Sequence, residues 1–275
     1  MKKKKVGIYL LVIFIAVIVV FPFYWMLVTS LQERGSLLIS PPKLFPDLKR
    51  INLSAYFTII RKYPVMRWFF NSLYVSIFST ISTLIISTMA GYSISRYRSK
   101  FNTIIGISLL IIRMLPGTLL IVPFYIIFQH LGLINNFLSL IIGNVAFTIP
   151  FATWMIKGFF DAIPVSIEDA ALIDGCTPLQ AIWKIILPLT APGLAATAIY
   201  AIILSWCEFL MAKTFMIGSD SWTISVGISS LIGEHVIIWN ELMAGAVFSI
   251  VPVMVLFLMF EKYLVSGMTA GAVKQ

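Results

Sequence analysis

The chain has 275 residues, of which 60% are hydrophobic and 11% are charged. Because soluble domains have about 45–50% apolar and about 25% charged residues, this composition excludes a soluble protein and predicts one domain embedded in lipid. The formal net charge of +9 is explained better by basic flanks against anionic lipid headgroups than by nucleic-acid binding.

Six stretches are apolar enough to cross a bilayer, for which about 20 residues are needed. The first should remain as a helix, because its apolar run is longer than that of a signal peptide and no small-x-small cleavage site follows. The predicted fold class is therefore all-α, a polytopic membrane protein with six transmembrane helices. The predicted spans are 6–28, 68–92, 104–128, 138–156, 191–212 and 245–265.

The orientation is predicted from the basic residues beside the spans. Lys2–Lys5 precede the first span, which places the N-terminus in the cytosol, and six spans return the C-terminus there. The basic segment Arg96–Lys100 then lies inside, whereas residues 130–136 lie outside and contain no Lys or Arg. The segment 30–67 disagrees, since it is placed outside and contains Arg34, Lys43, Lys49, Arg50, Arg61, Lys62 and Arg67. The orientation is retained because the first helix usually dominates topology.

A polar segment, residues 159–190, interrupts the apolar chain and is cytosolic in this topology. Ser166 is predicted to cap a short helix, with Asp169 three residues later as in a capping box. Gly175 is predicted to end that helix, because glycine tolerates the left-handed conformation.

A second short helix is predicted directly after Gly175. Thr177 and Gln180 form a capping box around Pro178, and Pro188 is predicted to break the chain before the fifth span. Helices this short are marginal in water and need a surface on which to pack. On the caps alone, that surface could be the membrane itself.

The same segment resembles a known signature. Permease subunits of ABC importers share a loop that reads Glu-Ala-Ala, three residues, Gly, nine residues and Ile-x-Leu-Pro. This chain has Asp169-Ala170-Ala171, Gly175 and Ile185-x-Leu187-Pro188 at the same spacing, with Asp169 in place of Glu and Glu168 before it. With "NSLYVS", "RMLPGTLLIVPFY" and the tail "SGMTAGAVKQ", the chain is similar to the carbohydrate branch of that family, in particular to the smaller maltose-type subunit.

The resemblance implies a domain layout and partners. It implies a first helix and outer loop (1–67), a permease core with five spans and the coupling loop 159–190 (68–266), and a cytosolic tail (267–275). The implied partners are a second homologous permease, two cytosolic ATPase subunits that bind ATP and Mg²⁺, an extracytoplasmic binding protein and a sugar. Residues implied to contact or move with the ATPase are Glu168, Asp169, Ala170, Ala171, Gly175, Ile185, Leu187 and Pro188, and in the tail Gly267, Thr269, Gly271 and Lys274.

Other kinds of site are disfavoured. The chain contains no G-x-x-x-x-G-K-[ST] motif, so it carries no nucleotide site of that kind. His130 and His235 have no second ligand at useful spacing, which argues against a metal. Cys176 falls in the cytosolic loop and Cys207 inside the fifth span, so a disulfide between them is not expected.

Polar residues inside the spans are candidates for a solute path, because intramembrane charges normally face a bundle interior or a cavity. The candidates are Arg113, Asn144 and Glu208. Arg113 could instead be a structural charge bonded to helix ends or to a buried acid. Glu208 could touch the binding protein, line the path or pair with Lys213. Asn144, like Asn71, could instead serve as a hydrogen bond between helices.

The predicted function is that of a transmembrane permease subunit in an ATP-driven importer for a sugar or oligosaccharide. The same machinery for glycerol phosphate or another polar solute remains an alternative, as does a self-sufficient carrier or channel. A membrane enzyme is disfavoured, because the sequence shows no pairing of a nucleophile with a base.

Overall fold

The computed structural model of the chain describes residues 2–33, 51–97, 99–233 and 237–270. In these residues the protein is helical, apart from one isolated bridge between Ile232 and Ile237. Four helices are long and apolar enough to cross a membrane, and the number rises to six if each of two bent helix pairs counts as one span. The predicted all-α membrane fold is confirmed.

The four long helices each extend beyond the apolar stretch that predicted them. Helical hydrogen bonding does not end where the apolar side chains end, so polar residues continue these helices past the predicted limits. Their bounds are α1 Lys2–Ser30, α3 Val65–Arg96, α6 Phe137–Asp161 and α13 Trp239–Ala270.

The core of the bundle lies where α3 packs on α6. Of the four long helices, α6 is the most buried. Helices in lipid associate through close backbone approach, which small side chains allow. At Gly91 of α3, an added Cβ atom would lie 3.1 Å from the carbonyl oxygen of Thr153 in α6. The face of α3 that is buried carries Ser72, Ser76, Ser79, Thr83, Ser87 and Gly91.

The predicted third span is not one continuous helix. It consists of α4 (Lys100–Met114) and α5 (Gly117–His130), which meet at an angle of 101°. Between them Leu115 is extended, with φ −72° and ψ 129°, because the ring of a following proline disfavours the helical conformation. Pro116 was therefore a local signal for this break, and the continuous span 104–128 was wrong.

The predicted fifth span also differs. α10 (Ala191–Trp206) ends with Cys207 as its C-cap, and a separate short helix, α11 (Leu210–Phe215), follows. Cys207 therefore ends the helix rather than lying inside it. Before α10, the segment 178–189 is bent from it by 72°. That segment consists of α8 (Pro178–Ala181), the π-helical turn η3 (Ile182–Ile186) and α9 (Leu187–Leu189).

Four shorter elements lie at the two ends of the bundle: α2 (Ser54–Lys62), α7 (Val165–Ile173), the 3₁₀ turn η4 (Ser219–Ser221) and α12 (Ile224–Ser229). The Trp68 indole N–H donates to the Ser219 carbonyl at 2.7 Å. The Asn71 amide donates to the carbonyls of Asp220 and Trp222, both at 2.9 Å. Asn71 thus holds a loop backbone rather than another helix, contrary to the prediction.

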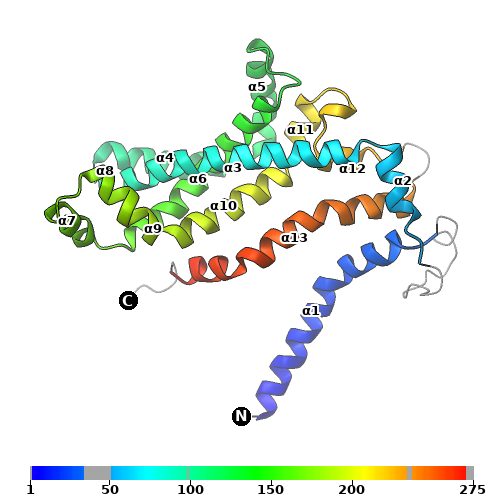
Figure 1. Cartoon of the computed structure of the whole chain (residues 1–275), viewed down its shortest axis with the longest axis horizontal. Helices are drawn as coiled ribbons and strands as arrows, with labels where there is room; N and C mark the ends of the chain where they lie inside the picture. The colour runs from blue at the N-terminus through cyan, green and yellow to red at the C-terminus, as the bar shows by residue number, and fades with distance from the viewer. Residues whose placement is uncertain (1, 34–50, 98, 234–236, 271–275) are drawn as a thin grey trace.

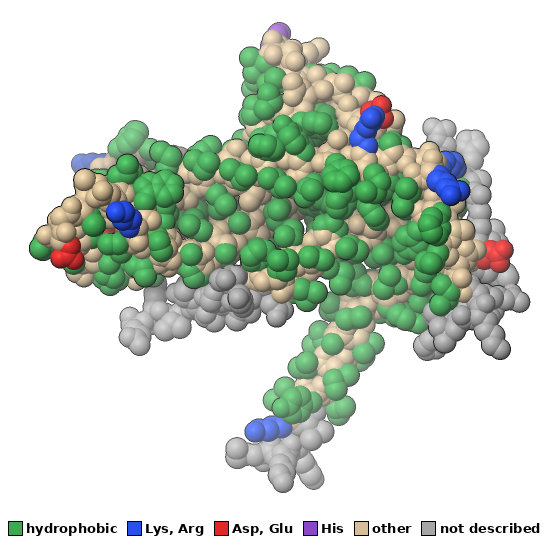
Figure 2. Space-filling view, in the orientation of Figure 1, with side chains coloured by type: hydrophobic (Ala, Val, Ile, Leu, Met, Phe, Trp, Pro, Cys, Tyr) green, Lys and Arg blue, Asp and Glu red, His purple; other side chains and the backbone are tan. Residues whose placement is uncertain are grey.

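Figure 1 shows α3 running the length of the bundle, from α2 and α12 at one end to α7 at the other. α1 leaves the bundle at an angle and contacts α13. In the view of Figure 2, hydrophobic side chains cover the middle of the molecule and charged side chains gather toward its ends. This distribution fits a bilayer crossed along the direction of α3.

Candidate functional site: the 159–190 loop and a polar cavity

The first short helix of the loop, α7, begins at Val165, directly after Pro164. The predicted cap by Ser166 is wrong, because Ser166 already lies inside the helix and the cap position is occupied by Pro164, without a side-chain hydrogen bond. The proline ring fixes φ near the helical value, so the chain enters the helix without a capping side chain. Glu168 lies in the first turn.

The turn that ends α7 is built on Gly175, whose φ is +88°. The Gly175 N–H donates to the Leu172 carbonyl at 3.1 Å, and the Cys176 N–H donates to the Ala171 carbonyl at 3.0 Å. This pair of bonds is a Schellman ending, which requires a left-handed residue that glycine supplies without steric cost. The predicted role of Gly175 as the stop of the helix is confirmed.

The second helix starts with the predicted capping box. The Gln180 N–H donates to the Thr177 hydroxyl at 3.3 Å, and the Thr177 N–H donates to the Gln180 side-chain oxygen at 3.0 Å. Pro178 occupies the first turn, where its missing N–H costs nothing. Both halves of the loop are thus defined by bonds between near neighbours in sequence.

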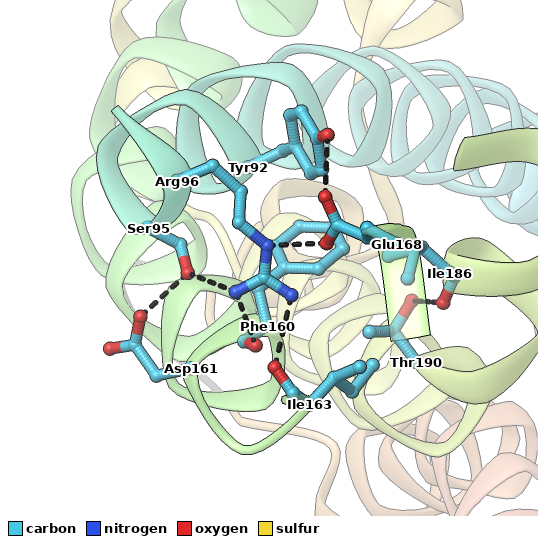
Figure 3. Close-up of polar contacts among 9 residues, drawn as sticks. All are labelled: Tyr92, Ser95, Arg96, Phe160, Asp161, Ile163, Glu168, Ile186 and Thr190. Atoms are coloured by element: carbon cyan, nitrogen blue, oxygen red, sulfur yellow. Dashed lines mark hydrogen bonds and ion pairs between the residues drawn. The ribbon is translucent and has the colours of Figure 1, made fainter. Parts of the chain in front are cut away.

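Pro188 was predicted to break the chain before the fifth span, but the helical backbone continues through it. The Leu187 N–H donates to the carbonyl of Ile182, five residues back, and Pro188 then lies in the first turn of α9, where a proline is tolerated. The bend falls instead at Thr190. Its buried hydroxyl donates to the carbonyls of Ile186 and Leu187, both at 3.0 Å, and Figure 3 shows the first of these bonds.

The residues of the loop motif divide between the interior and the surface. Ile185 and Leu187 pack against a buried cluster formed by Ile156, Phe160 and Ile186. These two motif residues therefore hold the loop on the ends of the membrane helices. Ala171 is also buried, with 3% of its surface exposed.

Asp169 and Ala170 lie at the surface of α7. Around them the loop exposes large apolar side chains, with 86% of Ile173 and 66% of Trp183 accessible. Apolar side chains this exposed mark an interaction surface, either for another protein or for the membrane. We refer to Leu172, Ile173, Leu179 and Trp183 as the exposed apolar set.

Glu168 points the other way, into the protein. Its carboxylate forms an ion pair with the Arg96 guanidinium at the end of α3, and it accepts a hydrogen bond from the Tyr92 hydroxyl at 3.1 Å (Figure 3). Only 13% of the Glu168 side chain and 8% of the Arg96 side chain are exposed. Two consecutive acids thus have different surroundings, since Asp169 of the motif is exposed and Glu168 just before it is largely enclosed.

The three residues predicted for the solute path come together. Arg113, Asn144 and Glu208 all line one cavity of about 330 Å³, together with mainly apolar side chains from α4, α5, α6 and α10. The Asn144 side chain is buried, and its amide nitrogen has no hydrogen-bond partner within the described residues. A buried amide without a partner is costly, so this nitrogen is an unsatisfied donor in the wall of the cavity.

Aromatic side chains hold Arg113. The alternative prediction was a structural charge bonded to helix ends or to a buried acid. One guanidinium nitrogen donates to the Tyr200 hydroxyl at 2.9 Å, and the guanidinium carbon lies 5.8 Å from the centre of the Phe151 ring. A guanidinium has five N–H donors. The phenol uses one of them, which leaves Arg113 able to donate into the cavity.

Glu208 lies in the break after α10 rather than within a span. Its two carboxylate oxygens accept the N–H groups of Met211 and Ala212 at 2.6 and 3.0 Å, which caps α11. The predicted alternative of a pair with Lys213 is not among the ion pairs of the described residues. The Lys213 ammonium lies instead 5.4 Å from the centre of the Trp222 ring.

Several predicted site residues remain without a described partner. Within the described residues, no three His, Cys, Asp or Glu side chains are grouped so that they could hold a metal ion. His235 lies outside the described residues, as do Gly271 and Lys274 of the tail, whereas Gly267 and Thr269 lie in the last turns of α13. Cys176 and Cys207 are both free thiols.

Sequence reasoning missed two residues of these sites. Arg96 entered it only as a topological charge, although a basic residue at the end of a buried helix was a signal that it needs an acid. Tyr200 gave no signal, because nothing in its local pattern separates it from the other aromatic residues of the spans. The contact of each with its partner is a product of the tertiary fold.

Known proteins resemble the chain over most of its length. Residues 82–270 match the model of the family described as binding-protein-dependent transport system inner membrane component. The sulfoquinovosyl glycerol transport system permease protein SmoH of Agrobacterium fabrum is 35% identical, over 92% of this chain and 88% of that protein. The trehalose/maltose transport system permease protein MalG of Thermococcus litoralis is 33% identical, over 98% and 97%. A chain from the crystal structure of a bacterial ABC transporter involved in the import of the acidic polysaccharide alginate superposes with a TM-score of 0.84 and 20% identity, covering 95% of this chain and 96% of that chain.

The fold and the site define a multi-pass α-helical membrane transport subunit with a capped polar loop at one end. The chain belongs to the binding-protein-dependent transport system inner membrane component family, the permease subunits of ABC importers. It is thus an inner-membrane protein without catalytic activity of its own, and the nucleotide that drives transport is bound by separate ATPase subunits.

Proposed function

We propose that the chain forms half of the path of a sugar or oligosaccharide importer, and that the 159–190 loop couples this path to a cytosolic ATPase subunit. The observation that carries the coupling role is the exposed apolar set beside Asp169, presented on a loop with capped, defined ends. Isolated helices of this length are marginal, and the core contacts of Ile185 and Leu187 hold these ones in place.

The solute class is supported by what relatives transport. Similar permeases serve trehalose and maltose in Thermococcus litoralis, arabinooligosaccharides in Bacillus subtilis and sulfoquinovosyl glycerol in Agrobacterium fabrum. These solutes share hydroxyl groups that accept hydrogen bonds, and Arg113 lines the cavity with donors that Tyr200 does not use. A cavity of about 330 Å³ is at the small end of ligand sites, which suits one sugar ring on a path shared with a second permease.

The solute class is tested with the complete transporter in liposomes, comprising both permeases, the ATPase subunits and the binding protein. We expect ATP-dependent uptake of at least one of trehalose, maltose, arabinotriose and sulfoquinovosyl glycerol, and no uptake by the present chain alone. Uptake of glycerol 3-phosphate but of none of the sugars would favour the alternative solute. Robust uptake by the single chain would overturn the importer mechanism in favour of a self-sufficient carrier.

We further propose that the α7 end of the bundle, both termini and the segment containing Arg96 face the cytosol. The four lysines at the N-terminus support this orientation, and so does the need of the loop to meet an ATP-binding subunit. The α2, η4 and α12 end then meets the binding protein. The tail residues Gly267, Thr269, Gly271 and Lys274 are proposed to contact the ATPase as well.

Labelling with a membrane-impermeant maleimide tests this orientation. In a Cys207→Ser background, we expect Cys176 to react in inside-out vesicles and not in right-side-out vesicles. Ser219→Cys, made in a background without Cys176 and Cys207, should show the opposite pattern, because Ser219 is exposed at the other end of the bundle. The reverse result at both positions would invert the topology.

A further inference from the structure

The end of α3 is tied to the 159–190 loop through one side chain. The Arg96 guanidinium forms its ion pair with Glu168 of α7 and donates to the carbonyls of Phe160 at 3.0 Å and Ile163 at 3.1 Å (Figure 3). Phe160 is near the C-terminus of α6 and Ile163 lies just beyond it, where the helix dipole favours a cation. Arg96 thus connects α3, α6 and α7 at a single point.

The surroundings of this pair make it a defined connection rather than a loose surface contact. Exposed ion pairs are worth little because water and salt screen them, but this pair is almost fully enclosed. A buried charge whose partner is removed is strongly disfavoured, so Arg96 and Glu168 hold each other in one arrangement. Neighbouring bonds extend it, since Ser95 accepts from Arg96 at 3.2 Å and donates to Asp161 at 2.6 Å.

The main packing partners of α7 are α8 and η3, which belong to the same loop. Its polar tie to α3 therefore links the loop to the helix that spans the bundle. α3 in turn forms the central contact with α6, and α6 contributes Asn144 to the cavity. A contiguous set of contacts runs from the loop to the cavity.

We infer that Arg96 and Glu168 are positioning residues that make the loop and α3 move as one unit, so that a displacement of the loop reaches the cavity. Glu168 in this mechanism acts inside the permease and does not contact the ATPase, whereas Asp169 and the exposed apolar set do. The inference rests on the proposed docking of the loop on an ATPase subunit. Arg96 and Glu168 would then transmit the displacement of the loop from that docking site to α3.

The test measures motion at the cavity, independently of the solute. Thr118 lines the cavity, so Thr118→Cys, in a chain without native cysteines, reports access to it by the rate of maleimide labelling. MgATP with vanadate is used as the probe that closes the ATPase subunits. In the complete transporter we expect this probe to change the labelling rate about ten-fold, which is within the usual range of coupling between linked sites.

Glu168→Gln and Arg96→Gln should reduce that response to less than about two-fold, while ATPase copurification stays close to normal. If the pair acts as a unit, the double variant should be no worse than the more affected single variant. Ile173→Ser is the contrasting change. Because Ile173 is exposed on the loop, this variant should lose ATPase copurification, which Glu168→Gln and Arg96→Gln should keep. Arg67→Gln is the matched control for ATPase copurification and for the stability of the complex, since it breaks an exposed ion pair with Asp220 at the other end of the bundle.

The yield and thermal stability of the assembled complex distinguish a positioning role of Arg96 and Glu168 from a merely structural one. These must be normal for a variant to count, and Glu168→Asp, which keeps the charge, should restore part of the response if Glu168→Gln assembles poorly. A full labelling response in Glu168→Gln would overturn the inference. Loss of copurification in Glu168→Gln but not in Arg96→Gln would overturn it too, by making Glu168 an ATPase contact. A different result would overturn the proposed docking of the loop on the ATPase: the ATPase copurifies normally with Ile173→Ser and also with Asp169→Asn.

Discussion

Gly175→Val is expected to abolish ATP-dependent uptake while leaving the protein in the membrane in normal amount. Gly175 has a φ of +88° and closes the Schellman turn between α7 and α8. A β-branched residue at positive φ is a genuine outlier, and backbone strain of this kind costs about 1–3 kcal/mol. That cost is too small to unfold the membrane bundle, but it is enough to shift α7 and the exposed apolar set away from the ATPase.

The control for this prediction is Gly218→Val. Gly218 has a similar φ of +83°, and a Cβ atom at either glycine would meet no other atom within 4 Å. Both variants therefore place a β-branched residue at a positive φ without a steric clash, one at each end of the bundle. ATPase copurification is measured for both, and Gly218→Val should leave it unchanged. Uptake of the transported sugar is measured for Gly175→Val, because Gly218 lies at the end proposed to meet the binding protein. If Gly175→Val retains full copurification and full uptake, the coupling role of the 159–190 loop is wrong.

Arg113→Gln is expected to lower uptake by the complete transporter about ten- to hundred-fold at saturating, solute-loaded binding protein. The reason is that Arg113 reaches the cavity with donors that Tyr200 does not use, and hydrogen bonds to charged groups contribute about 1.5–3 kcal/mol. ATPase copurification should be unchanged, because Arg113 is remote in sequence and structure from the 159–190 loop. The measurement is the initial rate of sugar uptake in liposomes.

Tyr200→Phe separates the two roles that Arg113 could have. It removes the described hydrogen-bond partner of the guanidinium and leaves the charge in the cavity. If Arg113 acts on the solute, this variant should change uptake by less than about three-fold, since a neutral hydrogen bond contributes only about 0.5–1.5 kcal/mol. Equal losses in both variants, together with a less stable complex, would show that Arg113 is a structural charge.

The loop between α7 and α8 was predictable because the interactions that form it are local. The capping box joins Thr177 to Gln180, and the turn bonds join residues on either side of Gly175. The spacing of the Asp169–Pro188 motif likewise depends on order along the chain alone. Membrane embedding followed from composition for a similar reason, since every residue contributes to it regardless of position.

The failures of the prediction come from competition between local signals. Ser166 is a good cap by type, but Pro164 already occupies the cap position two residues earlier. Pro188 is a helix breaker by type, but a π turn places it where its missing N–H is tolerated. Pro116 does break its helix, although the apolar run on both sides of it resembled a single span. Each outcome depends on which of two neighbouring residues controls the backbone.

Composition and local caps thus determined by themselves that this chain lies in a membrane and has a capped loop, and the resemblance of its motif to that of known permeases indicated the class. Only the tertiary structure decided how the loop is connected and where the path residues meet. Arg96 and Glu168 are 72 residues apart, and Arg113 is 87 residues from Tyr200. Such contacts exist because α3, α4, α6 and α10 pack together, and the choice of a partner for a buried charge is made by that packing rather than by any pattern along the chain.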